Sequence, residues 1–240
     1  MAFKEFQLED GTPVVVYKRR GSKSLRLSIT STGKVRVTIP TWTPYQAGLQ
    51  FARSRGRWIE QHKAAPSVLR DGQLVGKAHH LKFSPQPSAQ RISSRVLAGQ
   101  IIVGHPAVIS ADDERVQKVA RAACIRALRK QAEQLLPERL ASLAEKQGFR
   151  YRSVAVKQLK SRWGSCDQSQ NIVFNLFLMQ LPWQSIDYVI VHELIHTRVM
   201  DHGPDFWELF ESVLPSAKSM RREMRQYQPV LFTANPPLEK

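Results

Sequence analysis

The chain has 240 residues, of which 42% are hydrophobic, so it can bury the core of one large domain or two small ones. It has no apolar run of about 18 residues, and the acidic residues near its start leave no apolar signal segment, so we expect neither a membrane span nor secretion. The two cysteines, Cys124 and Cys166, are far apart. This spacing argues against a disulfide framework or a thiolate zinc site and favours a cytoplasmic protein.

The net charge of +16 is unevenly distributed along the chain. Residues 1–110 contain 17 Lys and Arg against 5 Asp and Glu, whereas residues 111–240 contain 19 against 15. A basic field attracts phosphates, so one interpretation is contact with nucleic acid or a polyphosphate through the first half. The other is that the charge only keeps the protein soluble. The oligomeric state is not indicated by these features.

Three β-branched segments open the chain and predict strands. They cover residues 12–19, 24–30 and 34–39. The last two alternate apolar with polar residues, and Ser31, Thr32 and Gly33 separate them. This pattern is typical of a hairpin with one buried face.

A helix and a second group of strands are expected to complete a small N-terminal domain. Thr43 as N-cap and Pro44 in the first turn predict an amphipathic helix that continues to about residue 65. The later strands are expected near residues 73–83, 91–97 and 100–103. We therefore predict a basic, β-rich domain with one helix at residues 1–110.

The remaining residues, 111–240, predict a second domain that begins with a long helix. Acidic residues follow Ser110 in what would be its first turn, apolar residues recur at helical spacing past a kink expected at Pro137, and Gly148 ends the pattern. A β-rich first domain followed by a mainly helical second domain with a short β-sheet predicts an α+β fold for the whole chain.

A polar segment that includes Arg162, Trp163 and Cys166 lies between two strand-like segments, which predict a hairpin at residues 154–158 and 172–175. We consider Arg162 a candidate clamp for an anion; the alternative is that it pairs with an acid. Cys166 could be a nucleophile, but no nearby residue in the sequence would lower its pKa.

The segment from His192 to His196 reads His-Glu-Leu-Ile-His within an apolar run that predicts a buried helix. Residues four apart share one side of a helix, so these two imidazoles can bind one metal ion. His-Glu-x-x-His on a helix is a zinc metalloprotease motif in which the glutamate is the general base. The alternative is a pair of hydrogen-bonded core histidines, but a buried Glu193 is costly without a cation or donors beside it.

A catalytic zinc site needs a third protein ligand and a position open to water. His202 follows the motif, and Gly203 and Pro204 would break the helix there. Glu208 or Glu211, on the next predicted helix, are alternative third ligands. Candidates to orient the ligand imidazoles are Asp187, Asp201 and Asp205.

Several linked motifs resemble the YgjP-like, or DUF45, metal-dependent hydrolase family, which is related to the SprT and WLM zinc metallopeptidases. The matching residues are Arg162 to Cys166, Asn175, Ile186 to His196, His202, Phe206 and Trp207. The resemblance covers about residues 150–215, and the basic strands at residues 12–40 also resemble that family's N-terminal region. It implies a zincin-like domain with zinc on His192, His196 and His202 and with Glu193 as catalytic base.

Together these observations predict a zinc-dependent hydrolase, with another divalent cation as an alternative metal. The substrate is a peptide or a nucleotide, because members of the family are described as metallopeptidases and a bacterial relative as a UTP pyrophosphatase. The basic half favours a polyphosphate, or a protein bound to nucleic acid, over a neutral peptide. A third alternative is a non-catalytic nucleic-acid-binding protein with structural zinc, although such a site usually has four protein ligands.

Overall fold

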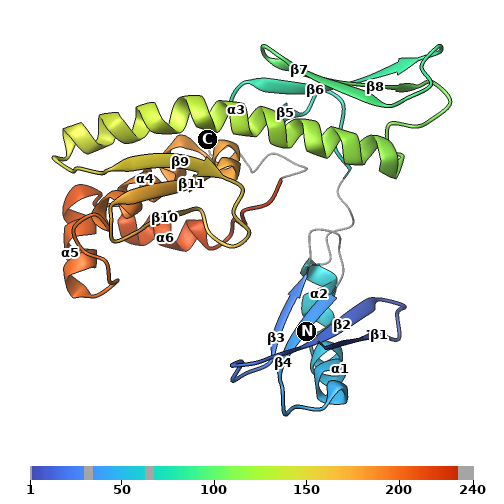
Figure 1. Cartoon of the computed structure of the whole chain (residues 1–240), viewed down its shortest axis with the longest axis horizontal. Helices are drawn as coiled ribbons and strands as arrows, with labels where there is room; N and C mark the ends of the chain where they lie inside the picture. Colours follow the sequence, from blue (N-terminus) through green and yellow to red (C-terminus); the bar gives the residue numbers. More distant parts are fainter. Residues whose placement is uncertain (1, 30–34, 63–67, 232–240) are drawn as a thin grey trace. The chain divides into compact units, whose positions relative to one another are not determined.

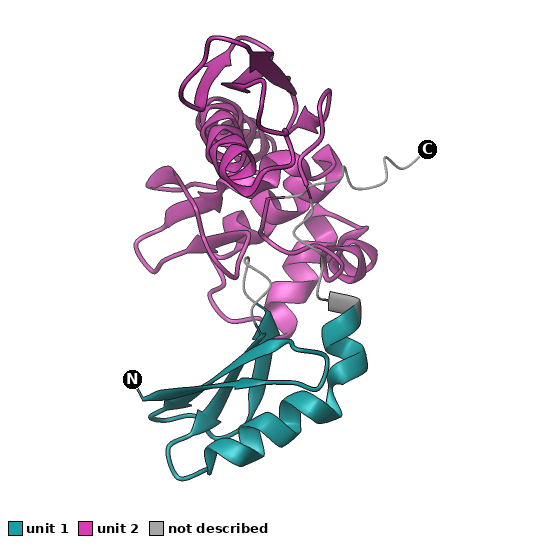
Figure 2. Ribbon diagram, turned by 90° about the vertical axis from the view of Figure 1, so that its right-hand side faces the viewer, with its two compact units in different colours: residues 1–67 teal, residues 68–240 magenta. Residues whose placement is uncertain are grey.

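The chain forms two compact units, Met1–Ser67 and Val68–Lys240, in an α+β fold (Figure 2). The computed structural model describes residues 2–29, 35–62 and 68–231. No helix in these ranges is both long and apolar enough to cross a membrane.

The first unit is a four-stranded sheet with two helices packed on one face. Its strands have the order β1-β2-β4-β3 and are β1 (Phe3–Gln7), β2 (Pro13–Arg19), β3 (Arg26–Ile29) and β4 (Val35–Pro40). The helices are α1 (Tyr45–Ser54) and α2 (Gly56–His62). A Cβ atom at Gly48 of α1 would lie 2.6 Å from Cγ1 of Val16, so this close helix–sheet contact requires glycine.

Most predicted elements of the first unit are present, with three differences. β3 and β4 pair antiparallel, as the hairpin pattern predicted, while the turn expected at residues 31–33 lies outside the described residues. β1 was not predicted. In place of the single expected helix there are two, because the backbone leaves the helical conformation at Arg55. The N-cap of α1 is Pro44 instead of Thr43, and no side chain forms a capping hydrogen bond there.

The second unit is built around one long helix, α3 (Glu114–Lys146) (Figure 1). Asp113 caps its start by accepting a hydrogen bond from the backbone N–H of Arg115, and Gly148, with φ of 67°, follows its end. The helix continues through Pro137. Apolar side chains of two separate sheets pack against its sides in a single core.

The first of these sheets has the order β5-β6-β8-β7. Its strands are β5 (Leu74–Val75), β6 (His79–Gln86), β7 (Ser93–Leu97) and β8 (Gln100–Pro106). Leu81, Phe83, Ile101 and Val103 alternate along β6 and β8 and join the core of α3. This sheet therefore belongs to the second unit, and the division between the units falls at residue 67 instead of at the expected residue 110.

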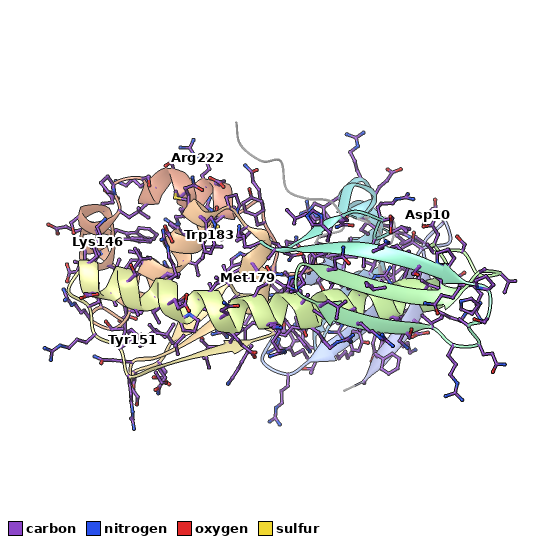
Figure 3. The ribbon with its side chains drawn as sticks, turned by 90° about the horizontal axis from the view of Figure 1, so that it is seen from above. Asp10, Lys146, Tyr151, Met179, Trp183 and Arg222 are labelled. Carbon is purple, nitrogen blue, oxygen red and sulfur yellow. The ribbon has the colours of Figure 1, made fainter. Side chains whose placement is uncertain are left out.

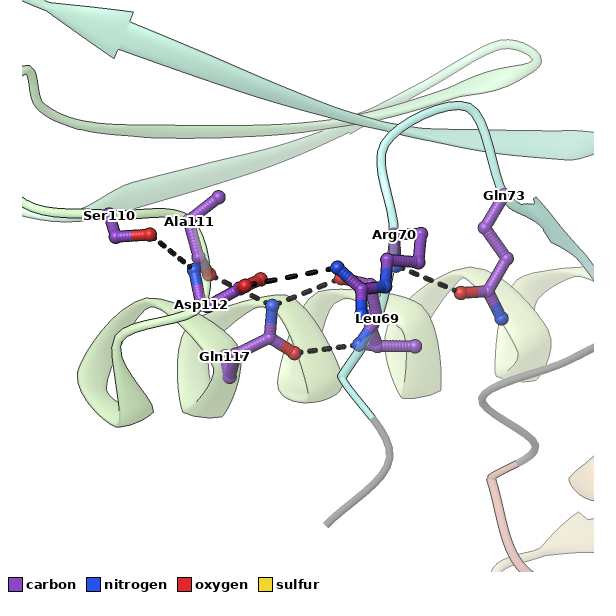
Figure 4. A network of polar contacts seen from close by, with 7 residues as sticks. All are labelled: Leu69, Arg70, Gln73, Ser110, Ala111, Asp112 and Gln117. Carbon is purple, nitrogen blue, oxygen red and sulfur yellow. Dashed lines mark hydrogen bonds and ion pairs between the residues drawn. The ribbon is translucent and has the colours of Figure 1, made fainter. Parts of the chain in front are cut away.

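Two buried glutamines of α3 also attach this segment to the helix. The side chain of Gln117 accepts from the N–H of Leu69 at 2.8 Å and donates to its carbonyl oxygen at 3.1 Å (Figure 4). Gln131 accepts from the N–H of Lys77 at 2.6 Å and donates to the carbonyl oxygen of Val75 at 3.0 Å. These contacts join residues about fifty positions apart, which explains why the sequence pattern did not reveal them.

The second sheet has the order β10-β11-β9 and leads into the remaining helices. Its strands are β9 (Ser153–Lys157), β10 (Gly164–Cys166) and β11 (Asn171–Asn175). β10 and β11 form the hairpin, and β9 pairs parallel with β11, so the hairpin expected between the segments at 154–158 and 172–175 is wrong in its pairing. The elements that follow are η1 (Leu176–Gln180), α4 (Trp183–Ile195), α5 (Pro204–Val213) and α6 (Ala217–Met224). Figure 3 shows Met179 and Trp183 beside α3.

Candidate active site

The C-terminal end of α4 carries two histidines on one side. Nine of the 13 residues of α4 are buried, and His192 lies in its last turn, one turn before the C-cap residue His196. Their ring centroids are 4.8 Å apart, and their Nε2 atoms are separated by 3.2 Å. The helical spacing of the motif therefore produces the convergence that the sequence predicted.

His202 completes this group from the segment that follows α4. The helix ends at Ile195, and α5 begins at Pro204 after an extended Gly203. Between them the chain turns back, so that Nε2 of His202 lies 3.0 Å from Nε2 of His192. The ligand atoms of the three histidines all lie within 4.8 Å of one another. Over the described ranges, no other three His, Cys, Asp or Glu side chains come together in this way.

The protonation of these histidines suits metal binding. Nδ1 of His196 lies 3.0 Å from the carbonyl oxygen of Val199, which can only accept, so the proton is on Nδ1 and the lone pair on Nε2. Burial, followed by the charges of His196 and His202, lowers the pKa of His192 to about 3. Because the Nε2 of His192 carries at most one proton, it cannot donate to both neighbours, whereas one cation would attract all three lone pairs. The donor set fits zinc.

Glu193 lies beside this group in a buried position, with a relative exposure of 5%. Burial raises the pKa of its carboxyl group to about 8, while the charge of Arg162 and a hydrogen bond from the backbone N–H of Cys166 act in the opposite direction. Oε2 of Glu193 is buried without a hydrogen-bond partner among the described residues. A carboxyl group with these properties can accept or return a proton near neutral pH.

Strand β10 forms the surface against which Glu193 packs. A Cβ atom at Gly164 would lie 2.6 Å from Oε1 of Glu193, so a glycine is needed where the strand meets the carboxyl group. Gly164 lies in the motif from Arg162 to Cys166, but its contact with Glu193 was not predicted. The sequence feature that could have indicated this contact is a glycine inside a strand, which often marks the close approach of another group.

Asn175 holds the loop that precedes β10. Its side chain is fully buried, and its Nδ2 donates to the carbonyl oxygens of Leu159 and Arg162, both at 2.9 Å. Its backbone N–H donates to the carbonyl oxygen of Trp163 at 2.8 Å. The side chain of Arg162 is exposed and forms no ion pair with a described residue, which leaves its guanidinium available to a ligand.

The acidic residues considered as an alternative third ligand, or as a group that orients an imidazole, do not take these roles in the structure. Glu211 pairs with Lys218 at 2.9 Å, and neither Glu211 nor Glu208 joins the histidine group. Asp187 makes two hydrogen bonds to Arg139, at 2.7 and 2.6 Å, so it does not orient a ligand imidazole.

The remaining candidates contribute less to the site. Burial lowers the pKa of His196, and the charge of Asp201 acts weakly in the opposite direction. Asp205 lies in the first turn of α5. Burial, followed by the charge of Glu193, raises the pKa of Cys166 to about 11, which makes its thiol a poor nucleophile.

Aromatic side chains of α5 pack against the histidines. The ring of His192 lies 5.0 Å from that of Phe206 and 5.6 Å from that of Phe210. Trp207 lies 6.4 Å from the ring of His202, and the guanidinium of Arg221 on α6 covers Trp207 at 4.4 Å. Arg221 was missed as a site residue because only the packing of α6 on α5 brings it there.

A His-Glu-x-x-His helix with a third histidine folded back onto it is the arrangement of a metal-dependent hydrolase. Residues 23–227 match the model of the family described as YgjP-like, metallopeptidase domain, and the chain belongs to this family. The family expected from the sequence motifs is thus confirmed, and with it the general class of metal-dependent hydrolase.

Two solved structures resemble parts of the chain. The metallopeptidase zymogen abylysin of Pyrococcus abyssi is 22% identical, with a TM-score of 0.36, and the match covers 41% of this chain and 100% of abylysin. The metallopeptidase zymogen jannalysin of Methanocaldococcus jannaschii is 15% identical, with a TM-score of 0.34, over 38% of this chain and 94% of jannalysin. No curated protein matches the chain.

Proposed function

We propose that this protein is a zinc-dependent hydrolase in which His192, His196 and His202 hold the metal and Glu193 is the general base. The observation that supports this most is the convergence of three imidazole nitrogens next to a buried carboxyl group, one oxygen of which has no hydrogen-bond partner in the described part of the chain. When bound, zinc would act as a Lewis acid and lower the pKa of a water molecule at its open position.

The protein's own groups have distinct roles in this proposal. Glu193 accepts the proton of the attacking water on Oε2 and returns it to the leaving group. The backbone N–H of Cys166 and the bare surface of Gly164 fix the orientation of the carboxyl group. Phe206 and Phe210 pack against the imidazole of His192 and limit its rotation.

A peptide is our first candidate substrate. β10 is an edge strand of its sheet, and it pairs with β11 on one side only. Because Gly164 of β10 contacts Glu193, a peptide that added to this edge in extended form would pass beside the catalytic base. This arrangement supports peptide hydrolysis, in keeping with the description of the family.

A nucleoside triphosphate such as UTP is the second candidate, because two arginines flank the histidine group. The charge of Arg162 acts on Glu193, and that of Arg221 acts on His192. Guanidinium groups bind phosphates in bidentate fashion. A polyphosphate chain between these two residues would present its phosphorus atom to the same base.

The third alternative, a structural zinc in a non-catalytic protein, has less support. A structural zinc site normally has four protein ligands. Three histidines make up the group found in the described part of the chain, which suits a site that keeps a position for water.

The test is zinc-dependent turnover of purified protein, with UTP and an unstructured protein offered in parallel. Glu193→Gln is expected to keep one zinc per chain and to lower kcat by about 10²–10⁴-fold, the usual contribution of a general base. Glu208→Gln, an exposed glutamate on α5, serves as the matched control and is expected to keep full activity. Undiminished turnover by Glu193→Gln would refute the proposed base.

The two substrates separate the remaining candidates. Release of pyrophosphate from UTP, lost in Glu193→Gln and reduced in Arg162→Gln, would identify a nucleotide hydrolase. Cleavage of the unstructured protein alone would identify a peptidase. Absence of any turnover by the zinc-loaded protein would favour the non-catalytic alternative.

A further inference from the structure

The sheet of the first unit has one covered face and one open face. Val14, Val16 and Val37 point toward α1 and α2 and are fully buried. The residues between them point to the opposite side, because successive side chains of a strand alternate. Strand pairing aligns the open side in two rows: Phe3, Tyr17, Thr38 and Arg26 in the first, and Glu5, Val15, Arg36 and Ser28 in the second.

Aromatic and guanidinium groups are stacked on this open side. Phe3 is 52% exposed, and its ring centroid lies 5.5 Å from that of Tyr17, with a tilt of 32° between the planes. The guanidinium of Arg36 lies 4.3 Å above the ring of Tyr17. Arg36 is itself exposed, so the outer side of its guanidinium plane faces solvent. The structure thus presents two flat surfaces, the Phe3 ring and the Arg36 plane, each against the ring of Tyr17.

The same side of the sheet is positively charged. Arg19, Arg26 and Arg36 are exposed and lie on it, while Glu5 is the carboxylate that shares it. None of these three arginines forms an ion pair with a described residue. Just beyond the end of β4, Trp42 is 71% exposed, and the adjacent Thr41 accepts a hydrogen bond from Lys18 at 2.9 Å.

We propose that this open face, formed by Phe3, Tyr17, Arg19, Arg26 and Arg36, binds a single-stranded nucleic acid. Unpaired bases stack on aromatic rings and on guanidinium planes, and this requires no particular base. Arg19 and Arg26 lie to the sides of the stacked groups and bind the phosphates of the strand. A duplex fits the face poorly, because its bases are already stacked on one another, and an acidic protein would make no use of the exposed Phe3 ring.

The test uses the full-length protein and a short fluorescent oligothymidine strand, with binding followed by anisotropy over a range of salt concentrations. With two phosphate contacts, from Arg19 and Arg26, the logarithm of the association constant is expected to fall with the logarithm of salt concentration with a slope of about −1.4. The duplex form of the strand is expected to bind at least about tenfold more weakly, and an oligouridine strand shows whether the sugar matters.

Two types of substitution separate stacking from charge. Phe3→Leu keeps apolar bulk and is expected to lower affinity at least about fivefold, without changing the salt slope, because a stacked base is lost. Arg26→Gln is expected to reduce the magnitude of the slope by about 0.7. Arg53→Gln, an exposed arginine on α1 at the covered side of the sheet, is the matched control and should leave both quantities unchanged.

The proposal is overturned by any of three results. These are no binding of the single strand at low salt, wild-type affinity in Phe3→Leu, or an equal loss in Arg53→Gln and Arg26→Gln. Circular dichroism of each variant, together with retained zinc binding by the second unit, verifies that the substitutions leave the fold intact.

Discussion

Glu193 on α4 packs so closely on Gly164 of β10 that a Cβ atom on the glycine would lie 2.8 Å from its Cγ and 2.9 Å from its Cδ. A helix side chain and a strand backbone rarely come this close, because the side chains of the strand normally separate them. Here the absence of a side chain lets the carboxyl group rest on the strand and accept the N–H of Cys166. The position of the proposed base therefore depends on a residue with no functional group.

Gly164→Ala should displace the carboxyl group of Glu193 while leaving the histidines in place. A misplacement of about 1 Å can cost about 10²-fold in rate, so we expect kcat to fall by about 10–100-fold with zinc still bound. The check is kcat together with zinc content. Gly56→Ala is the control, since its Cβ would meet no atom within 4 Å. Wild-type kcat in Gly164→Ala would show that the contact with Gly164 does not determine the position of the Glu193 carboxyl group.

His202→Ala should weaken zinc binding by more than the 10–100-fold typical of residues that only support a ligand. The side chain is exposed, so its loss should leave the free energy of unfolding of the metal-free protein nearly unchanged. Competition with a chelating dye measures the affinity. Loss of zinc in Glu208→Ala but not in His202→Ala would identify Glu208 on α5 as the third ligand in place of His202.

Asn175→Asp should loosen the loop that carries Arg162. The substitution keeps the oxygen that accepts from the N–H of Phe177 but removes the two N–H groups that bind Leu159 and Arg162. Because the site is fully buried and each unsatisfied carbonyl costs about 1–3 kcal/mol, we expect a loss of roughly 2–4 kcal/mol in unfolding free energy. Urea unfolding measures this loss; an unchanged midpoint would contradict it.

Gln131→Leu should destabilise the second unit although it adds an apolar side chain to a helix. It leaves the N–H of Lys77 and the carbonyl oxygen of Val75 without their partner, which we expect to cost about 2–4 kcal/mol in urea unfolding. Gln134→Leu is the same change on an exposed side of α3 and should alter stability by less than about 0.5 kcal/mol. Similar losses in both variants would show that the helix surface, and not the hydrogen bonds, is responsible.

The metal-binding group could be anticipated from sequence because it depends on local geometry. A four-residue spacing on a helix brings His192 next to His196, and Gly203 with Pro204 indicates where the chain turns back. The groups that support the site could not be anticipated in the same way. The carbonyl of Val199 carries no sequence signal, and the contacts of Gly164 and Arg221 depend on packing between separate elements.

The fold shows the same division between local and distant information. Periodicity predicted α3 and its end at Gly148, because hydrophobic spacing and a glycine with positive φ are local features. The expected boundary at residue 110 and the pairing of residues 154–158 were incorrect. They depend on the bonds of Gln117 and Gln131 and on the parallel pairing of β9 with β11, which join distant parts of the chain.

Helix α3 has one further consequence for how the second unit unfolds. Leu81 and Ile101 of one sheet and Ile172 and Phe174 of the other belong to the same apolar core along this helix. Neither sheet can detach without exposing the side of α3 that it covers. Residues 68–231 should therefore unfold in a single cooperative transition. The smallest fragment able to retain the histidine group should start near residue 68, since a cut at 110 would remove the sheet of β5 to β8 that packs on α3.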